Sequence, residues 1–185
     1  MAYSSWSVIY GEQPSASKWN ILGTNDASFN DGTGIANLAT NVTSISNPYK
    51  FHVKRTAAAN TGNNAFATVV YDTEAYDTNN NFSTSTGTYT APVNGFYHFS
   101  WSGSAATSAG GQTVLFSLFV SGTETARGSR ALSNAAGILG SSGSATVQLS
   151  ATNAVTVRAY GNATFALDVG GANYNYFTGF LVSQT

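Results

Sequence analysis

Residues 87–101 read Gly87-Thr-Tyr-Thr-Ala-Pro-Val-Asn94-Gly95-Phe-Tyr-His-Phe-Ser-Trp101, and this stretch decides the fold. The Asn94-Gly95 pair is a strong turn signal, because both residues tolerate the positive φ angles that tight turns require. On either side of it lie short runs rich in Thr, Tyr and Phe, which favour strands. The stretch therefore predicts one strand over residues 87–91, a turn, and a second strand over residues 96–101.

The same alternation of short apolar runs and turns continues from Tyr49 to the end of the chain. Seven or more strands at such spacing predict an all-β sandwich or barrel. We expect the sections between residues 103–112 and 122–144 to be long polar loops, since they are rich in Ser, Ala and Gly. The remaining strands are predicted at residues 51–54, 66–71, 113–121, 145–150, 154–160 and 174–183.

Two of the predicted strands, residues 113–120 and 174–182, carry apolar side chains on both faces. Side chains alternate between faces along a strand, and a sandwich covers only one face. Identical subunits around a symmetry axis would cover the second face, and the alternative is a loop folded over it. We therefore predict a homotrimer, with an interface formed by Leu115, Phe119, Tyr174, Tyr176 and Phe180.

The composition excludes several classes of function. Charged residues make up 8% of the 185 residues and the net charge is -1, whereas an average domain has about 25% charged residues. A nearly neutral chain has no basic surface for nucleic acid, and no apolar run is long enough to span a membrane. The 13% aromatic content is too high for a disordered chain, and the absence of cysteine excludes disulfides.

Residues 1–49 differ from the rest of the chain, because they are polar and contain too few apolar residues to form a core. We interpret them as an extended N-terminal arm that packs against other proteins, the alternative being that it packs against the chain's own second domain. The start of the chain lacks the pattern of a cleaved signal peptide, so we expect export as part of a particle released by lysis. The predicted attachment residues are Trp6, Trp19, Ile21, Leu22 and Phe29.

Residues 50–185 resemble the C1q globular domain. The resemblance is carried by Tyr71-Asp72, Thr86-Gly87, the sequence Tyr89-Thr-Ala-Pro92, the Gly95-Phe-Tyr-His-Phe99 motif and the closing Phe177-Thr-Gly-Phe-Leu181. It implies a jelly-roll sandwich of the C1q/TNF kind, assembled as a tight trimer with the last strand near the threefold axis. We expect two domains, the arm over residues 1–49 and the C1q-like head over residues 50–185.

Residues 10–36 resemble a segment that recurs in phage tail and virion structural proteins. The segment includes Gly11-Glu-Gln-Pro-Ser-Ala-Ser-Lys-Trp-Asn20 and Asp31-Gly-Thr-Gly-Ile35. In such proteins it commonly precedes a variable C-terminal head. The resemblance implies that the arm attaches the protein to a virion.

Residues suited to catalysis or metal binding are few. His52 and His98 lack the spacing of a metal site, so we interpret them as ordinary strand residues. Asp72, Glu74 and Asp77 form an acidic cluster, for which hydrogen-bonded turns are the first interpretation, ahead of a cation site or a glycosidase pair. We predict no catalytic residue, no metal and no cofactor.

Recognition is expected in the loops, where Glu124, Arg127 and Arg130 concentrate charge in a charge-poor chain. The overall prediction is a trimeric phage tail fibre or baseplate-attached fibre, not an enzyme, whose head binds a host surface glycan or protein. The alternatives are a capsid decoration protein that stabilises the particle, and a bacterial surface or spore-coat trimer.

Overall fold

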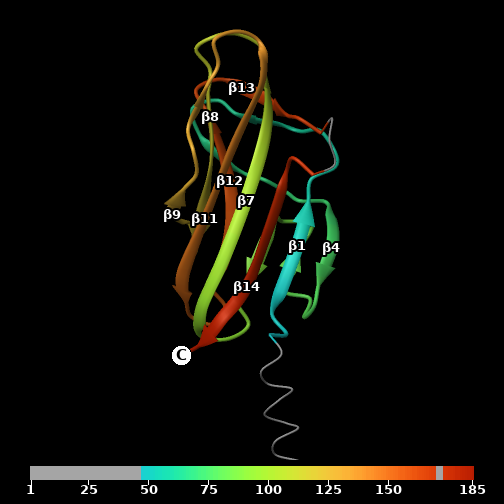
Figure 1. The fold of residues 1–185 in the computed structure, drawn as a ribbon, viewed down its shortest axis with the longest axis vertical. Helices are drawn as coiled ribbons and strands as arrows, with labels where there is room; N and C mark the ends of the chain where they lie inside the picture. The colour runs from blue at the N-terminus through green and yellow to red at the C-terminus, as the bar shows by residue number, and fades with distance from the viewer. Residues whose placement is uncertain (1–46, 170–172) are drawn as a thin grey trace, which may run out of the picture. The chain divides into compact units, whose positions relative to one another are not determined.

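Antiparallel strands form two seven-stranded sheets that face each other (Figure 1). A computed structural model describes residues 47–169 and 173–185 of the chain, and this part contains strands and turns but no helix. The predicted all-β class is therefore confirmed. Residues 1–46 of the predicted arm, which include Trp6, Trp19, Ile21, Leu22 and Phe29, lie outside the described residues.

The first sheet is built around the long strand β7, which pairs with β11 along its whole length and with β14 and β13 on its other side. In Figure 1, β11, β7, β14, β1 and β4 lie side by side in the front layer. The strands of this sheet are β1 (Lys50–Lys54), β2 (Asn60–Gly62), β4 (Thr73–Asp77), β7 (Gly95–Thr107), β11 (Gly137–Leu149), β13 (Thr164–Leu167) and β14 (Tyr176–Gln184).

The second sheet is centred on β8 and β12, which pair with each other over seven residues. Strands β9 and β10 extend it on the β8 side, and β3 and β6 pair with β12. Its strands are β3 (Phe66–Thr68), β5 (Phe82–Ser83), β6 (Thr88–Thr90), β8 (Thr113–Val120), β9 (Thr123–Arg127), β10 (Ala131–Leu132) and β12 (Ala154–Gly161).

Aromatic side chains fill the space between the two sheets. The ring of Phe51 on β1 stacks on Tyr89 of β6, with 4.6 Å between centroids, and meets Phe177 of β14 edge-on at 4.9 Å. Tyr89 also contacts Phe99 of β7 at 5.8 Å, and all four side chains are buried. Burial of each such side chain stabilises the fold by about 1.5–3 kcal/mol, so this cluster holds the sheets together.

A glycine makes room for this cluster. Gly179 lies opposite Phe51 on one side and Phe99 on the other, in the middle of the first sheet. A Cβ at this position would lie 2.4 Å from the Phe99 ring, far closer than van der Waals contact. The Gly179 of the closing motif is therefore required by the packing of the core.

Two sequence predictions about loops were wrong. Most of the segment between residues 122 and 144 forms strands β9, β10 and the first part of β11, and β7 continues to Thr107. The small residues of β11 pair with β7 at every position from Gly137 to Leu149, and a Cβ on Gly143 would lie 2.4 Å from Trp101. Small residues here allow close packing on an aromatic ring, and the ladder compensates for their low strand propensity.

Replacing Gly179 by alanine should destabilise the head by about 1–3 kcal/mol, because the added methyl group overfills the aromatic core. Urea unfolding followed by circular dichroism measures this loss. Gly140→Ala is the matched control, since a Cβ at Gly140 meets no atom within 4 Å. Equal stability of the two variants would contradict the packing role of Gly179.

Candidate functional site

The outward surface of the first sheet is aromatic, and we call Tyr76, His52, Tyr176, Phe180 and His98 the aromatic face. The imidazole of His52 lies between Tyr76 and Tyr176, with ring centroids 6.0 Å and 5.7 Å away. Phe180 contacts His98 at 5.5 Å and is still 45% exposed. Neighbouring apolar side chains, Phe96 and Val182, are exposed as well, so several large apolar side chains lie on this sheet without cover in the single chain.

Both histidines have protein partners on this face. The pKa of His52 lies below its usual value of 6.5, mainly because the side chain is partly buried and secondly because the charge of Lys54 is near. The Nδ1 atom of His98 lies 3.1 Å from the hydroxyl of Thr146 on β11. In the part of the chain that the structure describes, no group of three His, Asp or Glu side chains could hold a metal ion.

The structure separates the five predicted interface residues into two groups. Tyr176 and Phe180 belong to the aromatic face, and Tyr174, just before β14, is 52% exposed. Leu115 and Phe119 lie on the other sheet and are only 5% and 6% exposed in the single chain. The ring of Phe66 covers Phe119 at 5.0 Å, so the burial of these two residues does not require a second subunit.

The three residues of the acidic cluster have different settings: Asp72 bonds to a distant segment, Glu74 is exposed on β4, and Asp77 bonds to the turn after β4. The Asp72 carboxylate accepts hydrogen bonds of 2.9 Å from the backbone N–H groups of Thr56 and Ala57, and others from the hydroxyls of Thr56 and Thr73. Partial burial acts to raise its pKa, but these hydrogen bonds outweigh burial and hold the pKa below its usual value. Asp77 closes its own turn by accepting from the backbone N–H of Phe82 at 2.7 Å.

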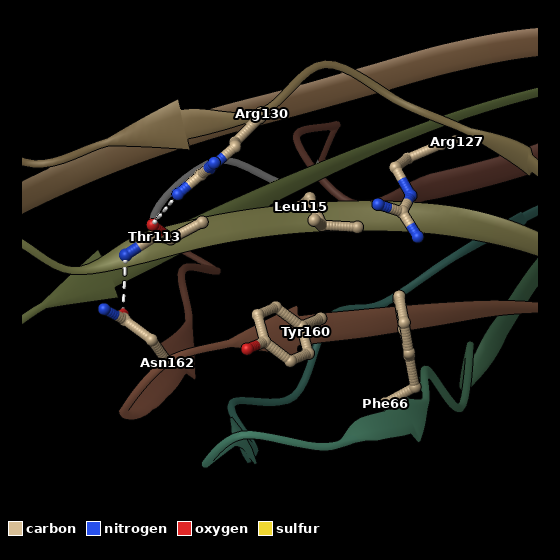
Figure 2. A pocket seen from close by; sticks show the side chains of 7 residues that line it. All are labelled: Phe66, Thr113, Leu115, Arg127, Arg130, Tyr160 and Asn162. Carbon is tan, nitrogen blue, oxygen red and sulfur yellow. Dashed lines mark hydrogen bonds between the residues drawn. The ribbon is translucent and has the colours of Figure 1, made fainter.

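A pocket of about 320 Å³ opens on the outward surface of the second sheet (Figure 2). Its floor is apolar, with Leu115 from β8, Tyr160 from β12 and Phe66 from β3. Tyr160 is directly opposite both of the others in the two ladders. We call this site the arginine pocket, and its other lining residues are Thr113, Arg127, Arg130 and Asn162.

The two arginines of the pocket are held differently. Arg127, at the end of β9, makes a two-pronged ion pair with Glu124, at 2.8 Å and 2.6 Å, and this hydrogen bonding lowers the pKa of Glu124. Arg130 follows β9 and donates from Nη2 to the hydroxyl of Thr113 at 3.2 Å, as Figure 2 shows. The backbone N–H of Thr113 donates in turn to Oδ1 of Asn162 at 2.7 Å.

The three charged residues that the sequence predicted for recognition therefore lie close together, although Glu124 and Arg127 are in a strand. Sequence reasoning missed the aromatic floor. Phe66 and Tyr160 were both inside predicted strands, but the sequence analysis did not assign either side chain to a face of the sheet. Nothing in the sequence indicated that β3 and β8 would flank β12 on the two sides.

Comparison of the sequence with models of protein families identifies the family of the head. The model named C1q domain matches residues 50–182, which is most of the chain. The chain belongs to the C1q domain family. Domains of the C1q and TNF kind form homotrimers, and they are generally binding or signalling domains rather than enzymes.

Solved structures show the same jelly-roll fold. The globular domain of the zebrafish complement 1qA protein has a TM-score of 0.55 and 20% identity, and the match covers 74% of this chain and 99% of that one. The Eiger TNF of S. frugiperda has a TM-score of 0.61 and 12% identity, and the match covers 74% of this chain and 94% of that one. Murine APRIL at pH 5.0 has a TM-score of 0.53 and 10% identity, and the match covers 72% of this chain and 98% of that one. No curated protein sequence matches the chain.

The C1q/TNF jelly-roll prediction is thus confirmed for the head. The comparisons do not cover the segment that resembles virion proteins, so its role stays a prediction. Within the described residues there is no helix with the length and hydropathy needed to cross a membrane.

If the aromatic face joins subunits, Phe180→Glu should convert a trimer into monomers, because assembly would then have to remove three carboxylates from water. Light scattering coupled to size-exclusion chromatography at micromolar concentration measures the mass. Leu132→Glu is the control, an equally drastic change at an exposed apolar residue of the second sheet. A trimeric Phe180→Glu variant, or a monomeric wild type, would contradict the assignment.

Asp72→Asn should lower the free energy of unfolding at pH 7 by about 1–2 kcal/mol, since charged hydrogen bonds to Thr56 and Ala57 become weaker neutral ones. The folded pKa of Asp72 lies below the unfolded value of about 3.9. Its contribution is therefore present above that value and is lost as the pH falls through the folded pKa. Urea unfolding should show a smaller difference in the free energy of unfolding between wild type and variant at pH 2.5 than at pH 7.

The exposed carboxylate of Glu74 offers the matched control for that experiment. Glu74→Gln removes the same charge two positions along the chain, on β4, and should change stability by less than about 0.5 kcal/mol. A difference between wild type and Asp72→Asn that persists at pH 2.5 would refute the electrostatic explanation.

Proposed function

We propose that this protein is a non-enzymatic structural component of a phage particle, a homotrimeric tail fibre or baseplate-attached fibre. Residues 1–49 attach it to other virion proteins, and the C1q head binds a glycan on the host surface. The observation that carries the proposal is the arginine pocket, which combines an aromatic floor with charged and polar side chains. Aromatic rings pack against sugar rings, while Asn, Thr and Arg side chains hydrogen-bond to hydroxyl groups.

The positions of the two surfaces support this division of roles. The aromatic face lies on the outward side of the first sheet, and the arginine pocket lies on the outward side of the second. A trimer assembled through the aromatic face leaves three arginine pockets accessible on its periphery. Three weak sites on one head, repeated over a particle, raise avidity without any new contact.

The virion role is supported by the resemblance of residues 10–36 to a segment of phage structural proteins. It is tested by adding purified protein to particles that lack it. Full-length protein should co-sediment with these particles, whereas protein lacking residues 1–46 should stay in the supernatant. Circular dichroism of the truncated protein checks that the head is folded. Co-sedimentation of a folded truncated head would show that the arm is not the anchor.

Electron microscopy of the particles distinguishes the proposed fibre from a capsid decoration protein. Density at the tail or baseplate supports host attachment, and density on the capsid exterior supports the stabilising role. Excess full-length protein should also block adsorption of the phage to its host if the head recognises the receptor. Unimpaired adsorption under saturating protein would overturn the receptor-binding part of the proposal.

A further inference from the structure

Positive charge is concentrated on the outward surface of the second sheet. Arg127 and Arg158 lie directly opposite Ser117, one on each side of β8, and Arg130 contacts Thr113 on the same strand. Three of the four arginines of the chain therefore share this surface. A local cluster of cations in a nearly neutral chain attracts anionic ligands.

The cluster is only partly neutralised. In residues 47–169 and 173–185 the ion pairs are Arg55 with Asp72 and Arg127 with Glu124. Arg158 instead lies over the ring of Phe119, with its guanidinium carbon 4.3 Å from the centroid, and Arg130 bonds to the neutral hydroxyl of Thr113. Both keep a full positive charge without a carboxylate partner, and of the two only Arg130 lines the pocket.

The floor beneath Arg130 suits the apolar side of a sugar ring. The rings of Phe66 and Tyr160 are adjacent, with centroids 5.3 Å apart, and Leu115 continues this row across the ladder. Asn162 stands at the rim, where its side chain is fixed by Thr113 and by the carbonyl of Gly111 at 3.0 Å. The volume of about 320 Å³ is at the lower end for small-ligand sites, which suits a single sugar unit.

We propose that the arginine pocket binds a carboxylate-bearing sugar unit, such as a uronic acid, within an acidic polysaccharide. The inference rests on the proposed function for its choice of a glycan ligand, and adds the charge of that ligand. The guanidinium of Arg130 pairs with the sugar carboxylate, a geometry in which two N–H groups meet two oxygens. The sugar ring packs on Phe66 and Tyr160. Glu124 competes with the ligand by occupying Arg127.

Isothermal titration calorimetry of the full chain tests this with three probes. Trigalacturonate carries the carboxylates, a neutral galactose trisaccharide lacks them, and galactose 6-phosphate carries a different anion. We expect trigalacturonate to bind at least about tenfold more tightly than either of the others, corresponding to one charge-assisted pair. Equal affinity for the neutral trisaccharide, or a preference for the phosphate, overturns the proposal.

Two variants with opposite expected effects on affinity separate a specific effect from misfolding, because misfolding would weaken binding in both. Arg130→Gln should weaken trigalacturonate binding about tenfold, whereas Glu124→Gln should strengthen it severalfold, because it frees Arg127 and removes a competing carboxylate. Lys50→Gln is the charge-matched control on the other sheet and should bind like the wild type. Overlapping affinities of Arg130→Gln and Lys50→Gln, or weaker binding by Glu124→Gln, count against the proposal.

The experiments distinguish failure of acidic-sugar binding from failure of the virion role. If trigalacturonate does not bind at millimolar concentration but the protein still blocks phage adsorption, the acidic-sugar inference is wrong and the proposed function stands. If trigalacturonate binds as expected and the protein neither joins particles nor affects adsorption, the pocket chemistry stands and the virion role is wrong.

Discussion

The stack of Phe51 on Tyr89 is the contact on which the two-sheet architecture depends. It joins the first sheet to the second at 4.6 Å, and Phe99 and Phe177 surround it from β7 and β14. The rings of Phe51 and Phe99 crowd the position between them in the first sheet, where a Cβ would lie 2.4 Å from the Phe99 ring. Gly179 occupies this position without a side chain, so the closing motif of the chain and its central motif are two halves of one packing arrangement.

Because the aromatic core occupies the inward faces, the outward faces of the two sheets are free to differ. The first sheet presents His52, Tyr176 and Phe180, which are apolar or weakly polar and suited to contact with another subunit. The second sheet presents Arg127, Arg130 and Arg158 around an aromatic floor, which suits an anionic ligand. The alternation of side chains along the strands thus produces a core and two outward surfaces, for which we propose roles in assembly and in recognition.

The charged residues of the proposed recognition site could be predicted from the sequence, but the shape of the pocket could not. The concentration of Glu124, Arg127 and Arg130 was visible in the sequence because charge is so rare in this chain. Their setting was misjudged, since a segment of Ser, Gly and Ala looks like a loop when read alone. Pairing of β11 with β7, and of β9 with β8, makes it sheet because backbone hydrogen bonds do not depend on the side chains.

The sequence was enough to predict the all-β class, the C1q resemblance of the head and the apolar character of both faces of β14, because strand periodicity and turn residues are local signals. Only the tertiary structure decided which residues meet across strands. Phe66 and Leu115 are far apart in the chain, yet both flank Tyr160, since β3 and β8 pair with opposite edges of β12. Leu115 and Phe119 are buried on the second sheet within one subunit, whereas Phe180 on β14 of the first sheet is exposed. Contacts of this kind depend on strand order, which local patterns do not encode.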